Sequence, residues 1–483
     1  MFSNLIDDSL IYKFTFYLSL KPLYSLPLSN IETFMGARLI YATIGIYIVY
    51  LLYQLANRIY KDPSKAFLTV ILFVTCTFFM SRGFRVRADL LLCLFQLLLI
   101  LFYFNFRESN KLLWIVAILL VLPLMLFSSP KVIFFLPVSL LFIGGHLYLR
   151  GEKKLELKII VGVLSLSAIV TGLLFVFFFK EFLSAWSYFV TSYGVSGHGG
   201  GFFNIKSWHY VLRLFKENPI FMGFILASIY LSKRNHKRNP ELIALRWAAM
   251  LSLIFIFIHS DRLPFFILAL LPLPVILAGG AIVDLLKEWQ LSKRVVSMLI
   301  MVLLAKASGY AVYTFLRNYN TDQVQAIQQI EGSLKSMIRE PTIYDGLGFL
   351  PRYPKLIPYY ITRDGQQSEL DLLKFLESKR PEIVFFSNRM FIHFRLVMDY
   401  LNENFYIPIG NGIYMKGRYM SELSPEQRQG YSLYAGSDFM DLKWIPPGEA
   451  FQPKPLMLIA PLPPIRLPGD KSFARIFDYD SRY

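Results

Sequence analysis

Long apolar runs alternate with short basic segments from residue 36 to residue 316. A helix needs about 20 apolar residues to cross a bilayer core of about 30 Å, so we interpret the runs as membrane spans. We predict about ten spans, at residues 36–57, 66–81, 89–106, 112–128, 131–149, 158–179, 219–232, 244–259, 264–287 and 294–316. The pattern therefore predicts a mainly α, multi-pass transmembrane helical bundle.

The pattern changes on both sides of this bundle. Residues 1–35 mix aromatic, charged and proline positions, which favours a segment lying at the outer membrane interface. Residues 317–420 alternate helical and strand signals and predict a small extramembrane α/β domain. Its expected helices are 322–338, 368–379 and 394–404, and its expected strands are 341–345, 355–361, 382–387 and 406–415. Residues 421–483 are rich in Pro, Gly and Tyr, which is typical of a β-rich tail of short strands.

Composition supports the membrane assignment. The chain is 55% hydrophobic and 17% charged, whereas soluble domains carry about 25% charge. Fifty Lys and Arg residues against 33 Asp and Glu residues give a net charge of +17. These cations separate apolar runs, so they indicate membrane topology and not a nucleic-acid partner. The cysteines, Cys76 and Cys93, lie inside apolar runs, where a disulfide framework is not expected.

The distribution of Lys and Arg predicts the orientation of the bundle. One set of alternate loops is strongly basic and is expected to face the cytoplasm. This set contains Arg58, Lys61, Lys65, Arg107, Lys111, Arg150, Lys153, Lys154, Lys158, Lys233, Arg234, Lys237, Arg238, Arg246, Lys287, Lys293 and Arg294. The N-terminus, the loop 180–218 and the C-terminal domain then lie on the outer face.

A few cations fall in the short outer loops, against the bias that orients the chain. They are Arg82, Arg85, Arg87, Lys131 and Arg262. Because Arg and Lys bind phosphate through charge-assisted hydrogen bonds, we expect these side chains to converge on one anionic group. The alternative is that they reach lipid headgroups, or pair with Asp89 and Asp261.

Two further segments carry candidate chemistry. Asp7 and Asp8 are the acidic cluster that precedes the first span, and either carboxylate is a candidate general base, unless both are simply solvated. The outer loop 180–218 places aromatic residues, including Trp208 beside His209, around a Gly-rich tip that contains His198. It is either a lid over substrate or an interfacial aromatic belt. His198 and His209 lack the spacing of metal ligands, so no metal site is predicted.

The order of these motifs resembles the GT-C type integral-membrane glycosyltransferases, in the branch of the lipid A aminoarabinose transferases and bacterial protein O-mannosyltransferases. The segments that carry the resemblance are Asp7-Asp8, Lys21-Pro22-Leu23, Ala37-Arg38-Leu39, Arg85-Val86-Arg87-Ala88-Asp89-Leu90-Leu91, Ser129-Pro130-Lys131, Leu136-Pro137, Trp208-His209-Tyr210, Arg262-Leu263-Pro264-Phe265-Phe266 and Leu271-Pro272-Leu273-Pro274. The resemblance implies a sugar transferase at the outer, periplasmic face of a bacterial cytoplasmic membrane, with a polyprenyl-phosphate sugar as its donor. It makes Asp7 or Asp8 the base and assigns Lys21 and the outer cations to the donor phosphate. The acceptor is a lipid, a protein or a glycan, and the resemblance assigns no divalent metal.

The chain departs from that family at two places. Family members have a cytoplasmic N-terminus and a span before the catalytic loop, whereas Met1 here stands six residues before Asp7. Either the true start codon lies upstream of Met1, or the protein lacks that span and is inactive. Lys21-Pro22-Leu23 also replaces the Lys-Pro-Pro of many members. Two other functions therefore compete with the transferase: a catalytically inactive membrane scaffold, and a transporter of lipid or sugar. Transporters tend to carry ionisable residues in mid-membrane positions and inverted repeats, whereas here Lys306 is the single clear charge in the middle of a predicted span and no repeat is visible.

Overall fold

The computed structural model divides into two compact units, which we describe separately. We call Ile6–Pro22 with Gly36–Val312 the membrane unit, and Met1–Leu5, Leu23–Met35 and Tyr313–Tyr483 the C-terminal unit. The residues described are 14–83, 86–129, 131–151, 162, 205–235, 239–258, 264–288, 293–318, 322–335, 340–344, 350, 353, 355–357, 365–385, 394–410, 413–417, 432–434 and 443–445. Apart from residue 162, the predicted span 158–179 lies outside them, and so does nearly all of the predicted tail 421–483.

Helices dominate the chain up to residue 335. They are α2 (Phe14–Ser25), α3 (Asn30–Tyr60), α4 (Pro63–Val74), α5 (Thr77–Arg82), α6 (Ala88–Ser109), α7 (Leu112–Leu126), α8 (Val132–Arg150), α11 (Ile205–Glu217), α12 (Pro219–Asn235), α13 (Pro240–Ile258), α14 (Pro264–Leu270), α15 (Pro272–Glu288), α16 (Lys293–Asn318) and α17 (Asp322–Lys335). Among the described residues, four helices are long and apolar enough to cross a membrane: Asn30–Tyr60, Ala88–Ser109, Val132–Arg150 and Pro240–Phe257.

Two predicted spans are each a pair of helices in the structure. The predicted span 264–287 breaks after Leu271, because Pro272 has no N–H to donate and its ring excludes a continuous helix. The predicted span 66–81 breaks at Thr75, whose hydroxyl bonds to the Ile71 carbonyl oxygen at 2.7 Å within its own helix. Such side-chain bonds to the preceding turn compete with the helix ladder. Both breaks fall near the ends that the sequence assigned to the outer face.

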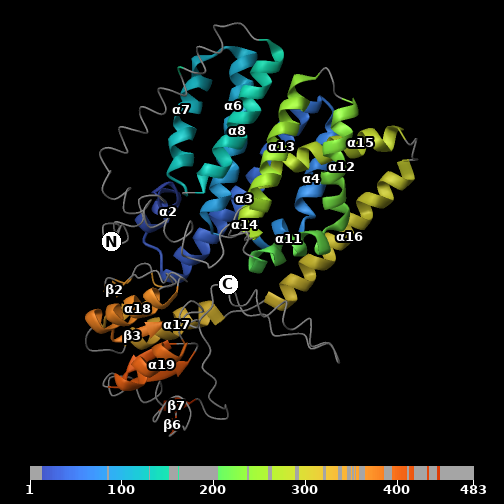
Figure 1. Ribbon diagram of the computed structural model, residues 1–483. Helices are drawn as coiled ribbons and strands as arrows, with labels where there is room; N and C mark the ends of the chain where they lie inside the picture. The colour runs from blue at the N-terminus through green and yellow to red at the C-terminus, as the bar shows by residue number, and fades with distance from the viewer. Residues whose placement is uncertain are drawn as a thin grey trace. The chain divides into compact units, whose positions relative to one another are not determined.

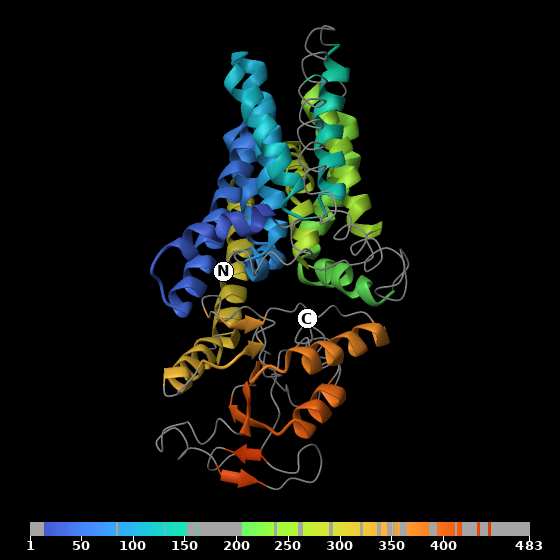
Figure 2. The same ribbon diagram turned by 90° about the vertical axis from the view of Figure 1, so that its left-hand side faces the viewer.

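The membrane unit is a layer of packed helices. Helix α6 contacts α7 on one side and α8 on the other, α8 contacts α13, α13 contacts α15, and α15 contacts α4 and α12. Helices α6, α7, α8 and α13 run in roughly the same direction, whereas α11 lies across that direction (Figure 1, Figure 2). Helix α11 is strongly amphipathic, as expected of a helix that lies along an interface.

Ion pairs connect helix ends that the sequence assigned to the cytoplasmic face. Arg58 pairs with Glu108, and Arg150 pairs with Glu241. The Lys65 Nζ lies 2.6 Å from an Asp284 carboxylate oxygen. These pairs join α3 to α6, α8 to α13, and α4 to α15. Several cations of the basic loops therefore have a structural role in holding neighbouring helices together.

Two adjacent glycines let α15 approach α4 and the end of α3 closely. A Cβ atom added at Gly279 would overlap the side chain and backbone of Thr69, and one added at Gly280 would overlap the Tyr60 ring. The Tyr60 hydroxyl donates to the Ile276 carbonyl oxygen at 2.9 Å across the same contact. Small residues at such contacts are typical of helix packing in membranes.

This contact predicts a large difference between two glycine-to-alanine variants. Gly279→Ala forces the Thr69 backbone to move, and we expect a loss of about 1–3 kcal/mol in the free energy of unfolding. Gly309→Ala on α16 is the matched control, because nothing lies within 4 Å of a Cβ there. Thermal unfolding of the purified protein in detergent measures both. Equal midpoints for the two variants would contradict the close approach.

The C-terminal unit contains a five-stranded mixed sheet with the order β2-β1-β3-β5-β4. Its strands are β1 (Ile343–Tyr344), β2 (Leu356–Ile357), β3 (Ile383–Phe385), β4 (Tyr406–Gly410) and β5 (Ile413–Lys416). β1 pairs in parallel with β2 and β3, and β5 pairs antiparallel with β3 and β4. The predicted strand 406–415 is thus two strands, β4 and β5, that pair antiparallel. A separate pair, β6 (Ser432–Tyr434) and β7 (Lys443–Ile445), is antiparallel.

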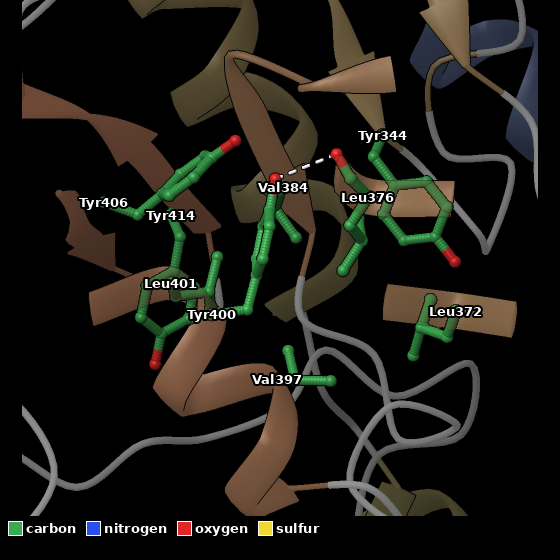
Figure 3. Close-up of a cluster of buried hydrophobic side chains, with 9 residues drawn as sticks. All are labelled: Tyr344, Leu372, Leu376, Val384, Val397, Tyr400, Leu401, Tyr406 and Tyr414. Carbon is green, nitrogen blue, oxygen red and sulfur yellow. Dashed lines mark hydrogen bonds between the residues drawn. The ribbon is translucent and has the colours of Figure 1, made fainter. Parts of the chain in front are cut away.

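Two helices, α18 (Gly365–Lys379) and α19 (Phe394–Glu403), pack against this sheet through a shared apolar cluster (Figure 3). The cluster consists of Tyr344, Leu372, Leu376, Val384, Val397, Tyr400, Leu401, Tyr406 and Tyr414. The buried Tyr400 hydroxyl donates to the Leu376 carbonyl oxygen at 2.9 Å, which links α19 to α18. The start of α3 belongs to this unit as well, because Asn30 Nδ2 donates to Glu331 Oε1 on α17 at 2.7 Å.

Candidate functional site

A buried ion pair connects the starts of α6 and α8. Lys131, which immediately precedes α8, places its Nζ 3.1 Å from Asp89 Oδ1, in the first turn of α6. Lys131 is 8% exposed and Asp89 is 4% exposed. Removing a lysine and a carboxylate from water costs several kcal/mol each unless they are paired, so the two side chains hold each other in place. The pairing that the sequence offered as an alternative for Asp89 is therefore present for Lys131.

Arg87 adds a second cation to the pair, and its Nε lies 3.6 Å from Asp89 Oδ2. Its side chain is 35% exposed, so it is more accessible than that of Lys131. We call Arg87, Asp89 and Lys131 the basic cluster. Counted alone, these three side chains have a formal charge of +1, and Arg87 has a further interaction outside them. An ammonium group has three donors, and Asp89 takes one of those of Lys131 among the described residues.

The surroundings of the basic cluster add to its positive potential. The N-termini of α6 and α8 both lie at the cluster, and helix N-termini carry partial positive charge and backbone N–H groups without intrahelical partners. The Lys131 ammonium also lies 5.7 Å from the centroid of the Phe266 ring of α14, which forms an apolar wall. A cluster of this kind is able to bind an anion such as a phosphate.

The beginning of α2 reaches the turn that carries Lys131. The Thr15 backbone N–H donates to the Phe127 carbonyl oxygen at 3.1 Å, at the end of α7. Thr15 is buried, and its hydroxyl has no hydrogen-bond partner among the described residues. Asp8 is seven residues before Thr15. Even a fully extended chain would therefore place the two Cα atoms at most about 25 Å apart.

The other predicted site residues have different placements. Asp7, Asp8, Arg85, His198 and Arg262 lie outside the described residues. Arg82 ends α5, and Trp208 and His209 belong to α11, but the positions of these three side chains are not described. Lys21 is exposed on α2. Of the predicted phosphate ligands, the structure therefore brings Arg87 and Lys131 together.

Sequence reasoning missed some residues that surround the basic cluster. The partnership of Thr15 with Phe127 and the packing of Phe266 on Lys131 join segments far apart in the chain, and neither has a local pattern. The Pro130-Lys131 motif and the acidic first turn of α6 were the available signals. Within the described residues, no group of three or more His, Cys, Asp or Glu side chains is arranged to hold a metal ion.

Comparison with known proteins gives a match of part of the chain to one protein family and a likeness to solved structures. Residues 28–176 match the family described as dolichyl-phosphate-mannose-protein mannosyltransferase. This segment includes α3 to α8 and therefore the whole basic cluster. A comparison with curated protein sequences gives no match.

Two solved structures of ArnT from Cupriavidus metallidurans are similar to the chain. The apo structure is 14% identical with a TM-score of 0.51, and the match covers 80% of this chain and 84% of that protein. The structure bound to undecaprenyl phosphate is 15% identical with a TM-score of 0.48, and covers 71% and 74% respectively. At this identity the likeness concerns the fold. The chain is thus an integral membrane protein that resembles the GT-C type glycosyltransferases, in sequence over residues 28–176 and in fold over most of its length.

Proposed function

We propose that the protein transfers a sugar from a polyprenyl-phosphate donor to an acceptor at the outer face of the bacterial cytoplasmic membrane. The observation that carries the proposal is the basic cluster, with its net positive charge at the N-termini of two spanning helices. The phosphate headgroup of undecaprenyl phosphate is negatively charged and would be attracted to the basic cluster. Its isoprenoid chain is apolar and would pack against the apolar helices around the cluster. The ArnT structure that binds this lipid supports the choice of donor class.

The cluster would act on the group that leaves. In sugar transfer from a polyprenyl phosphate, the bond between the sugar C1 and a phosphate oxygen breaks, and the lipid phosphate departs with an extra negative charge. Lys131 and Arg87 would bind this charge in a site partly closed to water, where electrostatic stabilisation is strongest. Asp89 would hold Lys131 in position while leaving its other N–H donors for the phosphate.

The N-terminal segment would supply the base. Asp7 or Asp8 would take the proton from the acceptor hydroxyl or amine as that nucleophile attacks the sugar C1. The bond from Thr15 to Phe127 supports this role, since it keeps the start of α2 beside the turn that leads to Lys131. The loop 180–218, with His198, Trp208 and His209, would close over the acceptor. Arg82, Arg85, Arg262 and Lys21 would extend the phosphate site.

A reconstituted transfer reaction tests the proposed activity. The protein is placed in lipid nanodiscs with undecaprenyl-phosphate pentose or hexose donors and a total membrane extract as acceptor, and released undecaprenyl phosphate is measured. We expect release that depends on the extract. A variant that should keep wild-type release is Ser252→Ala on α13. Among the described residues, its buried hydroxyl bonds within its own helix, to the Ala248 carbonyl oxygen at 3.0 Å. If folded wild-type protein and folded Ser252→Ala release no undecaprenyl phosphate from any of the donors, the inactive scaffold is favoured instead.

A further inference from the structure

Asn218 is the centre of a second buried polar cluster in the membrane unit. It directly precedes α12 and is 1% exposed. Its Oδ1 accepts the Thr77 backbone N–H at 3.1 Å and the Lys306 ammonium at 3.0 Å. Its Nδ2 donates to the Thr77 hydroxyl at 2.8 Å. One amide side chain therefore connects α5, α12 and α16.

This cluster explains the charge in the middle of a predicted span. An ammonium group within a membrane helix is costly unless it has polar partners, and Lys306 finds one in the Asn218 oxygen. The same oxygen bonds the backbone N–H of Thr77, the first residue of α5. The first N–H groups of a helix have no partner within the helix, so Asn218 acts as a cap supplied by another segment.

Helix α5 connects this cap to the basic cluster. It has six residues and ends at Arg82, and Arg87 follows five residues later as the residue that precedes α6. Helix α14 contacts both α5 and α6, and its Phe266 ring packs on the Lys131 ammonium of the basic cluster. A displacement of α5 would therefore move Arg82, its last residue, and would be passed on through α14 to the start of α6, which Arg87 precedes.

The geometry points to Asn218, supported by Lys306, as a positioning residue for Arg82 and Arg87. This inference rests on the proposed function, in which those arginines bind the donor phosphate. With Asn218 replaced by Leu, the Thr77 N–H is left buried without its acceptor, and α5 opens more readily. The cost of one unsatisfied buried donor corresponds to about a tenfold or larger change in an equilibrium. That change would appear in the affinity for the lipid phosphate.

Two measurements on the full chain in nanodiscs test the inference. Hydrogen–deuterium exchange of residues 77–83 reports on the opening of α5 and needs no sugar donor. The dissociation constant for undecaprenyl phosphate reports on the basic cluster. Asn218→Leu should speed exchange in α5 and weaken binding about tenfold. Asn218→Asp should restore both, because a carboxylate oxygen still accepts from Thr77 and Lys306. Ser228→Ala on α12 is the matched control, since among the described residues the buried Ser228 hydroxyl donates to the Ile225 carbonyl oxygen of its own helix at 2.7 Å.

Lys306→Met keeps the bond from the Thr77 N–H to Asn218 and removes the ammonium that also binds the Asn218 oxygen. It therefore tests the coupling of Asn218 to the basic cluster even if Asn218→Leu fails to fold. We expect a smaller loss of affinity, about twofold to fivefold, with the same regional rise in exchange. Unchanged exchange in α5 would overturn the cap, and faster exchange with unchanged lipid binding would overturn the positioning role. If wild-type protein binds no undecaprenyl phosphate, the proposed function fails, and the exchange measurement still decides whether Asn218 holds α5.

Discussion

Replacing Lys131 with Met is expected to abolish binding of undecaprenyl phosphate and to lower the stability of the protein substantially. The variant leaves Asp89 buried and without the ammonium that compensates it. Breaking a buried ion pair in this way costs about 3–5 kcal/mol. It also removes one of the two cations of the basic cluster. Thermal unfolding in detergent and lipid binding in nanodiscs measure the two effects.

A double variant separates the structural role of Lys131 from its role in binding. Lys131→Met with Asp89→Leu removes both charges, and replacing a buried pair by apolar side chains is often neutral or stabilising. We therefore expect the unfolding midpoint to recover while lipid binding stays lost. Recovery of binding together with stability would show that the pair serves the fold alone.

Arg150→Met is the matched control for these variants. Arg150 ends α8, the helix that Lys131 begins, and it pairs with Glu241 at a more exposed position. Exposed pairs contribute about 0–1 kcal/mol, so this variant should unfold close to the wild-type temperature. It should also bind undecaprenyl phosphate normally. A loss of binding equal to that of Lys131→Met would point to a general effect of charge removal.

Changing both Asp7 and Asp8 to Asn is expected to slow sugar transfer by about 100-fold to 10,000-fold, the usual contribution of a general base. The amide keeps the size and hydrogen-bonding groups of the carboxylate but does not accept the proton. Binding of undecaprenyl phosphate should remain, because the basic cluster is unchanged. Single-turnover transfer, measured beside the two single variants, shows which carboxylate acts. Full activity in the double variant would exclude both residues as the base.

The mainly helical character of the membrane unit was predictable because the length of an apolar run is a local property. The starts and ends of α6, α7 and α8 follow the predicted spans within a few residues. The breaks at Thr75 and Leu271 were not predicted, since hydropathy averages over them. In the C-terminal unit the division of the predicted strand 406–415 into β4 and β5 was missed for a similar reason. Pro408, Gly410, Asn411 and Gly412 interrupt an otherwise apolar sequence pattern.

The candidate site was predictable in part. The distribution of Lys and Arg between alternate loops identified Arg87 and Lys131 as unusual cations of the outer side. No local pattern predicts that these two residues, 44 positions apart, lie together. Nothing in the sequence connects Asn218 to Thr77, which lie 141 positions apart, or explains the charge of Lys306. Such contacts depend on which helices become neighbours, and that is decided by packing across the whole bundle.

The central claim is that the basic cluster binds the phosphate of an isoprenoid donor, and a comparison of two lipids tests it most directly. Undecaprenyl phosphate and undecaprenol share the same chain and differ in the phosphate. The account predicts that wild-type protein in nanodiscs binds the phosphate at least about tenfold more tightly, as one charge-assisted hydrogen bond or more would provide. That preference should vanish in the Lys131→Met, Asp89→Leu double variant. Equal affinities of the wild-type protein for the two lipids would contradict the account.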